Sequence, residues 1–284
     1  MDFTFQHKNS VLFIPDGLEP EVAWGRVTHL GIGAHPDDLE FMAWNAILKG
    51  VYNDKYYFGG VTLTDGGGSS RMGLYAHIDD AQMKALRLKE QKKAAVVGEY
   101  SALAALGYTS AQVRRDMRPE VKEDLKRIIK ASRPEVIFTH NLADRHRTHL
   151  AAVLLTIEAL RELGKEYYPK KFYGGEVWRS LDWLPNERRC LFDVSQRPNL
   201  SCSFMGLYDS QISGGKSYHQ ASFGRRAANA TYADAYAPDK AKLLELAMDL
   251  KPLLDNPQLA PADYLSKLID EFKKEALASL RASG

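Results

Sequence analysis

Over the first 170 residues, short apolar runs alternate with segments of helical character, and this alternation constrains the fold more than any other feature. Apolar runs bounded by small or turn-forming residues predict buried strands at 28–34, 56–64 and 135–139. The intervening patterns predict helices at 39–49, 79–98, 121–131 and 149–163. Strands that alternate with helices in this way form parallel sheets with right-handed crossovers. We therefore predict an α/β fold with a Rossmann-like open, mostly parallel sheet flanked by helices.

The pattern changes after about residue 170. Residues 173–181 and 188–194 predict strands in a more β-rich stretch. Apolar side chains at helical spacing then predict a helix over 264–280, whose apolar face serves core packing or an oligomer contact.

Nothing in the composition divides the chain into separate units. Its 284 residues are 45% hydrophobic and 26% charged, which is ordinary globular composition, and no Gly/Ser-rich or Pro-rich linker interrupts them. We therefore expect one domain over residues 1–284, with a Rossmann-like core at about 25–170 and a β-rich and helical C-terminal elaboration at about 171–284.

The charge balance argues against partners that need a strong field. Lys and Arg number 38 against 36 Asp and Glu, a net charge of +2, so we expect no nucleic-acid partner. The strongly apolar stretch 150–157 is far short of the ~20 residues that span a membrane. The N-terminus lacks a signal-peptide pattern, and Cys190 and Cys202 fit neither a disulfide framework nor a C-x-x-C metal motif. We expect a cytoplasmic protein that acts on a small molecule, and a homo-oligomer is compatible with the sequence.

The first chemically informative motif follows the first predicted strand. It reads Ala34-His35-Pro36-Asp37-Asp38. In an open parallel sheet, ligands bind outside the carboxyl ends of the strands. An imidazole and carboxylates are ordinary zinc ligands, and neighbouring Asp37 and Asp38 can point in different directions. The alternative interpretation is a turn whose aspartates cap the next helix.

A second cluster follows the strand at 135–139. Asp144, His146 and His149 form a D-x-H-x-x-H pattern, in which i,i+3 spacing puts the two histidines on one face of a helix. Asp144 is placed to accept a hydrogen bond from a histidine ring and fix its tautomer. If His35, Asp38 and His149 converge, they form a three-ligand site with an open position, which is the catalytic form of zinc.

These residues resemble the signature of the PIG-L/LmbE-like superfamily of zinc-dependent N-deacetylases. That superfamily includes the N-acetylglucosaminyl-phosphatidylinositol deacetylases and the mycothiol and bacillithiol biosynthetic deacetylases. The resemblance extends over about residues 28–236 and includes the segments 63–67, 87–98, 144–149, 209–211, 224–226 and 232–236. Thr148 stands where the family often has Asp, which leaves the ligands unchanged. Asp209 stands where many members have His, which questions a substrate contact in that loop.

The resemblance implies roles for individual residues. His35, Asp38 and His149 would hold one Zn²⁺ per chain, although another divalent metal such as Fe²⁺ is compatible. Asp37 would be the general base and His146 its acid partner. Zinc lowers the pKa of its water to about 7 and polarises a carbonyl, which an amide needs for hydrolysis.

The groups around this centre are assigned from physical reasoning. We expect Asp144 to orient His146 and to favour its charged form. Arg71, Arg87 and Glu90 are candidates for polar substrate contacts, and the alternative for Arg87 and Glu90 is an i,i+3 surface pair. Candidates for sugar stacking are Tyr173, Trp178 and Trp183, for which core or loop packing is the alternative.

We therefore expect removal of the N-acetyl group from an N-acetylglucosamine-type sugar or conjugate, which releases acetate and a free amine. The alternatives are a thiol-conjugate amidase that uses the same zinc site, and a non-catalytic carbohydrate- or metal-binding protein. Nucleotide binding by residues 31–36 is excluded because Pro36 occupies the third glycine position of the dinucleotide fingerprint. Gly215-Lys216-Ser217 is similar to the end of a P-loop, but Ser210 replaces its first glycine. We interpret it as a flexible loop over the site.

Overall fold

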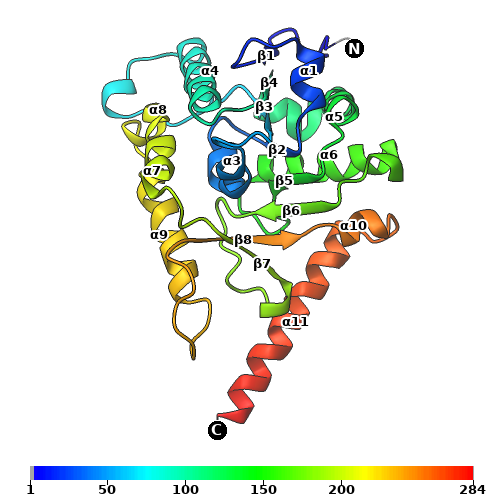
Figure 1. Ribbon diagram of the computed structural model, residues 1–284, viewed down its shortest axis with the longest axis vertical. Helices are drawn as coiled ribbons and strands as arrows, with labels where there is room; N and C mark the ends of the chain where they lie inside the picture. Colours follow the sequence, from blue (N-terminus) through cyan, green and yellow to red (C-terminus); the bar gives the residue numbers. More distant parts are fainter. Residues whose placement is uncertain (1–2, 284) are drawn as a thin grey trace.

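The computed structural model describes residues 3–283, whose strands form one eight-stranded sheet in the order β1-β4-β3-β2-β5-β6-β8-β7 (Figure 1). The strands are β1 (Val11–Phe13), β2 (His29–Gly33), β3 (Phe58–Thr64), β4 (Ala102–Tyr108), β5 (Val136–His140), β6 (Lys171–Gly175), β7 (Arg189–Asp193) and β8 (Leu244–Asp249). The five strands from β4 to β6 in this order are parallel, whereas β1, β8 and β7 pair antiparallel with their neighbours. The predicted α/β fold with a mostly parallel sheet is confirmed.

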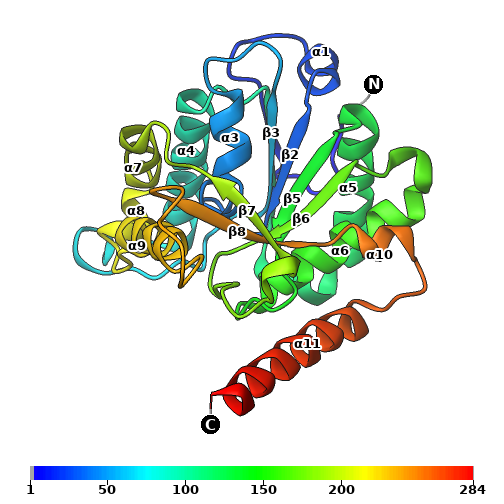
Figure 2. The same cartoon turned by 60° about the horizontal axis from the view of Figure 1, so that its bottom comes forward.

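Helices cover both faces of the sheet (Figure 2). One face carries α1 (Pro20–Gly25), α5 (Arg118–Ser132) and α6 (Arg147–Leu163), and the other carries α2 (Asp38–Met42), α3 (Trp44–Gly50) and α4 (Asp80–Val97). The C-terminal half adds α7 (Pro198–Gly206), α8 (Asp209–Ile212), α9 (Tyr218–Thr231), α10 (Pro252–Asp255) and α11 (Pro261–Ala282). Short helical turns lie at Gly73–Tyr75, Gln112–Asp116, Lys165–Tyr167 and Asn186–Arg188.

The order of the strands reverses between β2 and β5. From β2 the chain moves outward through β3 to β4 and then returns to the other side of β2 as β5. In open α/β sheets, ligands bind at such a switch point, outside the carboxyl ends of the strands. Because the two motifs predicted to bind a metal follow β2 and β5, the topology brings them to the same edge of the sheet.

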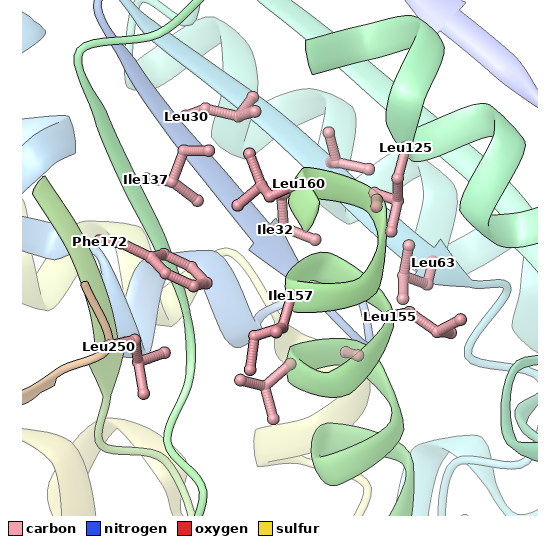
Figure 3. Close-up of a cluster of buried hydrophobic side chains, with 14 of the residues drawn as sticks. Leu30, Ile32, Leu63, Leu125, Ile137, Leu155, Ile157, Leu160, Phe172 and Leu250 are labelled. Carbon is pink, nitrogen blue, oxygen red and sulfur yellow. The ribbon is translucent and has the colours of Figure 1, made fainter. Parts of the chain in front are cut away.

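The larger hydrophobic core fixes α6 against the sheet. Leu30 and Ile32 of β2 share a buried cluster with Ile157 and Leu160 of α6, and all four are almost fully inaccessible to solvent (Figure 3). Burial of each such side chain stabilises the fold by about 1.5–3 kcal/mol. Since His149 lies in the first turn of α6, this packing also fixes the position of its imidazole.

Gly31 allows α2 to lie close to β2. A Cβ atom at this position would lie 2.6 Å from Cζ of Phe58 and 2.9 Å from Cδ2 of Leu39. Carbon atoms pack best at about 3.5–4.0 Å, so a side chain here would push α2 away. The bare backbone of Gly31 therefore helps to hold Asp38, the first residue of α2, at the end of the sheet.

The sequence patterns do not predict β1, β4 or β8. Residues 102–108 read Ala-Leu-Ala-Ala-Leu-Gly-Tyr and residues 244–249 read Leu-Glu-Leu-Ala-Met-Asp, and both are rich in residues that favour helices. Each of these two segments lies between two other strands, β4 between β1 and β3, and β8 between β6 and β7. Pairing on both sides and burial override the local preference.

Two predicted boundaries are wrong. The helix expected over 39–49 is interrupted at Ala43, which separates α2 from α3. The strand expected over 173–181 ends at Gly175, where a Cβ atom would lie 2.5 Å from the carbonyl oxygen of Met42. After it, the Glu176 carboxylate accepts the backbone N–H of Leu181 at 2.5 Å and closes a loop.

The C-terminal helix α11 extends away from the rest of the molecule (Figure 1). Tyr264 and Leu268 are its buried residues, and the hydroxyl of Tyr264 donates to the carbonyl of Asp249 at 2.7 Å. Arg188 binds Glu271 through two nitrogens at 2.7 and 2.9 Å. The side chains from residue 272 to residue 283 are exposed. The first half of α11 therefore provides most of the contacts that attach this helix to the rest of the protein.

None of the helices within residues 3–283 is both long and apolar enough to cross a lipid bilayer. The single domain, the cytoplasmic location, the absence of a nucleic-acid partner and a homo-oligomer stay predictions.

Candidate active site

The loop after β2 is held in an unusual backbone conformation. Asp37 has a φ angle of 101°, in the left-handed region that residues other than glycine rarely adopt. Its backbone N–H donates to Oε1 of Gln91 at 3.1 Å, and the Arg87 guanidinium donates to the carbonyl of Pro36. Both partners lie on α4, so this helix holds a strained turn of the kind found at functional sites.

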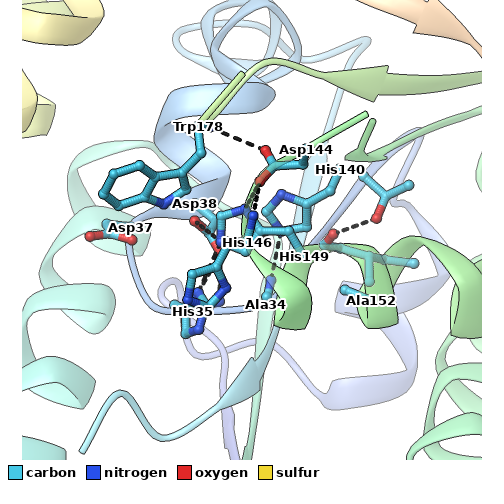
Figure 4. A network of polar contacts seen from close by, with 12 residues as sticks. Ala34, His35, Asp37, Asp38, His140, Asp144, His146, His149, Ala152 and Trp178 are labelled. Atoms are coloured by element: carbon cyan, nitrogen blue, oxygen red, sulfur yellow. Dashed lines mark hydrogen bonds and ion pairs between the residues drawn. The ribbon is translucent and has the colours of Figure 1, made fainter. Parts of the chain in front are cut away.

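The three side chains predicted to bind a metal converge (Figure 4). Nδ1 of His35 lies 3.1 Å from Nε2 of His149 and 3.1 Å from Oδ2 of Asp38. Nε2 of His149 lies 3.4 Å from Oδ1 of Asp38. Ligands about 2.0–2.1 Å from a tetrahedral Zn²⁺ are separated by about 3.3–3.4 Å, which is close to these separations. The ring nitrogens of His35 and His149 and the two carboxylate oxygens of Asp38 therefore have a spacing that suits one ion.

The ionisation of this cluster suits metal binding. Burial lowers the pKa of His149 to about 3, so its ring is neutral and offers a lone pair. Burial opposes ionisation of Asp38, but the three neighbouring imidazoles hold its pKa well below the usual range. A neutral histidine and an ionised carboxylate are the forms that bind a cation.

Sequence reasoning missed His140, the last residue of β5. It is fully buried, and its ring stacks on that of His149 with centroids 3.9 Å apart. His35, His146 and His149 form one group of potential metal ligands, and His140 forms another with Asp38 and His149. Its Nε2 atom accepts the backbone N–H of Ala34 at 3.0 Å, which occupies the lone pair that a metal would need. His140 therefore supports the cluster from behind by packing against His149. Its position at the end of an apolar strand was the sequence signal that could have identified it.

Asp144 contacts a different histidine from the one expected. Its Oδ1 atom lies 3.2 Å from Nδ1 of His149, whereas it reaches His146 only through the backbone N–H, at 2.8 Å. Its Oδ2 atom accepts the backbone N–H of Trp178 at 3.1 Å (Figure 4). The carboxylate therefore orients a predicted metal ligand and ties the loop after β6 to it.

His146 lies at the N-terminus of α6, beside the cluster. Its ring centroid is 4.8 Å from that of His35 and 4.6 Å from that of His149. Burial, with His35 as the next cause, lowers the pKa of His146, although the charges of Asp38 and Asp144 favour its charged form and oppose the shift.

Asp37 is paired with a buried arginine. Nη2 of Arg87 lies 3.0 Å from Oδ2 of Asp37, and Arg87 is 1% exposed. Burial raises the pKa of Asp37 to about 6, although Arg87 opposes the rise. A carboxylate with a pKa near neutrality is suited to take and return a proton.

The three predicted substrate contacts lie in different surroundings. Arg87 lines the cavity, but its guanidinium is engaged with Asp37. Glu90 accepts the backbone N–H and the hydroxyl of Ser210 at 2.7 and 2.6 Å, so it faces α8. Arg71 donates to the carbonyl of Gly67 and to Asp80, both at 2.6 Å. Among the described residues that line the cavity, Arg71 and Glu90 are absent.

A cavity of about 950 Å³ opens above the cluster, at the carboxyl ends of the strands. Ligand pockets of about 300–1,000 Å³ are usual for small molecules. Of the three aromatic candidates, Trp178 lines the cavity, whereas Tyr173 packs near Phe138 and Trp183 near Phe272. The wall is formed by residues from six segments, 35–42, 65–70, 109–111, 176–178, 216–218 and 221–226, among others.

Metal-competent side chains at the switch point of a doubly wound sheet, beside a cavity of ligand size, define an enzyme of the metal-dependent α/β class. Residues 30–160 match the model of the PIG-L family, described as GlcNAc-PI de-N-acetylase. This match confirms the resemblance stated from the sequence motifs, and the protein is a deacetylase-type hydrolase.

Solved structures share the fold at low identity. The 4-carboxy-2-hydroxymuconate hydratase of Pseudomonas putida KT2440 has a TM-score of 0.62 and 18% identity, over 82% of this chain and 98% of that one. The N,N'-diacetylchitobiose deacetylase of Pyrococcus horikoshii has a TM-score of 0.62 and 16% identity, over 80% and 85%. The A40926 pseudoaglycone deacetylase Dbv21 has a TM-score of 0.58 and 17% identity, over 79% and 97%. No curated protein sequence matches significantly.

Proposed function

We propose that the protein is a zinc-dependent N-deacetylase that removes the acetyl group from an N-acetylglucosamine-type sugar or sugar conjugate and releases acetate and a free amine. The observation that carries this proposal is the spacing of 3.1–3.4 Å among the donor atoms of His35, Asp38 and His149. The description of the matched family as GlcNAc-PI de-N-acetylase supports the amino-sugar substrate. The name of the Pyrococcus enzyme supports it as well.

His35, Asp38 and His149 would hold the ion through two ring nitrogens and the carboxylate of Asp38. When bound, Zn²⁺ supplies Lewis acidity that polarises the acetyl carbonyl and lowers the pKa of water. Fe²⁺ suits the same imidazole and carboxylate donors.

Asp37 is the proposed general base. Its carboxylate lines the cavity next to the cluster, and Arg87 fixes it there through the contact of 3.0 Å. It takes the proton of the attacking water and carries the proton that the departing nitrogen needs. His146 lines the same cavity and presents its ring to the oxygen on which negative charge develops. Asp144 holds the ring of His149 in the orientation that directs Nε2 toward the ion.

Acetate release tests the proposal. The zinc-loaded protein is incubated with N-acetylglucosamine, N,N'-diacetylchitobiose and an N-acetylglucosamine conjugate, and the released acetate and the new primary amine are measured. If the proposal holds, the two products form in equal amounts. A thiol-conjugate amide is included because a thiol-conjugate amidase would cleave it at the same site. Absence of acetate from every N-acetylated sugar, with zinc bound, would overturn the proposal.

A further inference from the structure

The segment between β3 and α4 forms one wall of the cavity and then continues to α8. Residues 65–70 line the cavity, and the chain that follows them, drawn in cyan in Figure 1, passes beside α8. None of residues 71–80 is buried, and the apolar side chains of Met72 and Leu74 are 62% and 74% exposed. Packing against the core therefore does little to hold this segment in place.

The hydrogen bonds of the segment are almost all internal. Backbone N–H groups at positions 69, 75, 76 and 78 donate to the carbonyls three residues earlier, and the contacts of Arg71 also stay within residues 66–80. Within residues 3–283, a single hydrogen bond leads from residues 69–78 to a residue outside 66–80. In this bond the hydroxyl of Tyr75 donates to Oδ2 of Asp209, the first residue of α8.

Asp209 is well prepared to accept this bond. Its Oδ1 atom accepts the hydroxyl of Ser213 at 2.7 Å. The hydrogen bonds from Tyr75 and Ser213 lower the pKa of the Asp209 carboxyl, so it is ionised at neutral pH. The same bond, followed by burial, raises the pKa of Tyr75 to about 12, so the phenol keeps its proton. A hydrogen bond from a neutral donor to a carboxylate is stronger than one between two neutral groups.

The segment also lies against the loop that follows α8. A Cβ atom at Gly73, where φ is +53°, would lie 3.3 Å from the carbonyl oxygen of Ser213. A Cβ atom at Gly215 would lie 2.9 Å from Sδ of Met72. Residues 216–218 of this loop line the cavity, as residues 65–70 do. The bond between Tyr75 and Asp209 therefore joins two walls of the cavity that are 134 residues apart in sequence.

The two ends of the segment differ in freedom. Glycines occupy positions 66–68, and Gly66 has a φ angle of 68°. Glycine backbones change conformation at little steric cost. At the other end, Asp79 and Gln82 cap α4 reciprocally, so the start of this helix is fixed. A glycine-rich end next to a fixed helix is an arrangement in which a short segment can move as a unit.

We propose that Tyr75 and Asp209 are positioning residues that hold residues 66–78 as a lid along one side of the cavity, and that ligands enter and leave when this contact opens. Asp209 thereby acts on the site through the lid and makes no contact with substrate. Access to the cavity does not depend on which reaction occurs there, so the lid goes beyond the proposed deacetylation.

Tryptic cleavage after Arg71 measures how often the lid opens, because this bond lies within the segment. Tyr75→Phe and Asp209→Ala should each be cleaved about tenfold faster than wild type, since each removes a hydrogen bond to a charged group and raises the open population. Asp209→Asn keeps an oxygen that accepts the phenol and should stay near the wild-type rate. Mass spectrometry of the zinc-loaded full chain follows the cleavage.

Tyr52→Phe is the matched control, because Tyr52 is 71% exposed and lies before β3, at the opposite end of that strand from the lid. Its cleavage rate should equal that of wild type. Equal rates in wild type, Tyr75→Phe and Asp209→Ala would overturn the proposal. An Asp209→Asn variant that is cleaved as fast as Asp209→Ala would overturn the hydrogen bond as its cause.

A cross-link tests whether the lid must open during turnover. Tyr75→Cys/Asp209→Cys, made in a Cys202→Ser background because Cys202 is exposed, is treated with a bismaleimide or with N-ethylmaleimide, which cannot bridge the two thiols. The bridged form should release acetate roughly tenfold more slowly, because a closed lid limits substrate entry and product release. Equal turnover in the two forms would overturn the lid.

The outcomes separate the lid from the proposed function. If no N-acetylated sugar releases acetate, the deacetylase proposal fails, while the cleavage rates at Arg71 still decide whether Tyr75 and Asp209 hold the segment. Acetate release together with equal cleavage of wild type and Tyr75→Phe would support the deacetylase and overturn the lid.

Discussion

Oδ1 of Asp144 lies 3.2 Å from Nδ1 of His149, so the nitrogen that faces away from the cluster has a carboxylate partner. A carboxylate at this distance favours the tautomer with the proton on Nδ1, which leaves the lone pair of Nε2 for a cation. The same carboxylate also accepts the backbone N–H groups of His146 and Trp178. Asp144 thus sets the position of a predicted ligand, a predicted acid partner and the cavity wall.

We expect Asp144→Asn to weaken zinc binding by about 10–100-fold, which is the usual effect of removing such an outer partner. Competition with a fluorescent chelator measures the affinity. Asp182→Asn is the control, because Asp182 is exposed and accepts only the hydroxyl of Ser180, at 2.6 Å, among the contacts described. Equal zinc affinity in wild type and Asp144→Asn would contradict the assigned orientation of His149.

Asp37→Asn should reduce turnover by about 10²–10⁴-fold, because an amide cannot accept the proton of the attacking water. Zinc content should stay near one per chain, since Asp37 does not belong to the three-ligand cluster. Acetate assays and elemental analysis measure the two quantities, with exposed Asp54→Asn as the control. Unchanged turnover would reject Asp37 as the base, and loss of zinc would assign it to the metal site instead.

The pair between Arg87 and Asp37 is buried, so removal of one partner leaves an uncompensated charge. In metal-free protein we expect Arg87→Met to lower the free energy of unfolding by about 3 kcal/mol. In an Asp37→Asn background the same substitution should cost clearly less. Urea denaturation of the two single variants and the double variant completes the cycle. Equal costs in both backgrounds would show that the arginine stabilises the fold through its packing and its other contacts, with Glu90 and the carbonyl of Pro36, and not through Asp37.

His29 gives the fold a sensitivity to acid. It is 5% exposed, and burial, followed by the influence of Lys49, lowers its pKa to about 4. Because the unfolded chain takes up this proton at a pKa of ~6.5, stability falls as the pH drops from about 6.5 to 4, by up to about 3 kcal/mol. His29→Gln should flatten this part of the stability profile measured by urea denaturation, whereas exposed His77→Gln should leave it unchanged. A profile that is the same in both variants would contradict this assignment.

Two leucines of α11 form a matched pair. Leu268 is 1% exposed and Leu280 is 71% exposed. Leu268→Ala should cost about 2–5 kcal/mol, because it opens a cavity between α11 and the body of the protein. Leu280→Ala should change stability by less than about 0.5 kcal/mol. Thermal and urea denaturation of both variants tests this, and a large cost for Leu280→Ala would indicate a contact absent from the single chain.

The convergence of His35, Asp38 and His149 could be predicted from sequence because each follows an apolar run, and the ends of parallel strands share one edge. The partner of Asp144 could not, because the rotation of the first turn of α6 decides which imidazole meets its carboxylate. The loop of Lys216 was expected over the site, and Lys216 lines the cavity. The contact of Arg225 with the carbonyl of Val177 could not be predicted, because it depends on the path of the chain after β6.

The same limit applies to strands β4 and β8. Their alanine, leucine and methionine residues favour helices locally, and only their neighbours in the sheet impose an extended backbone. Conversely, α4 was predictable at both ends. Asp79 and Gln82 form a reciprocal cap at its start, with bonds of 2.8 and 2.9 Å, and Gly98 follows its last turn.

Strands β2 and β5 are hydrogen-bonded neighbours, with His29, Leu30 and Gly31 opposite Val136, Ile137 and Phe138. The backbone ladder therefore draws the two halves of the reaction centre together before any ion arrives. The metal-free protein should therefore keep its fold and bind the ion without refolding. Its affinity for the ion should not be reduced by a free-energy cost of bringing the ligands together.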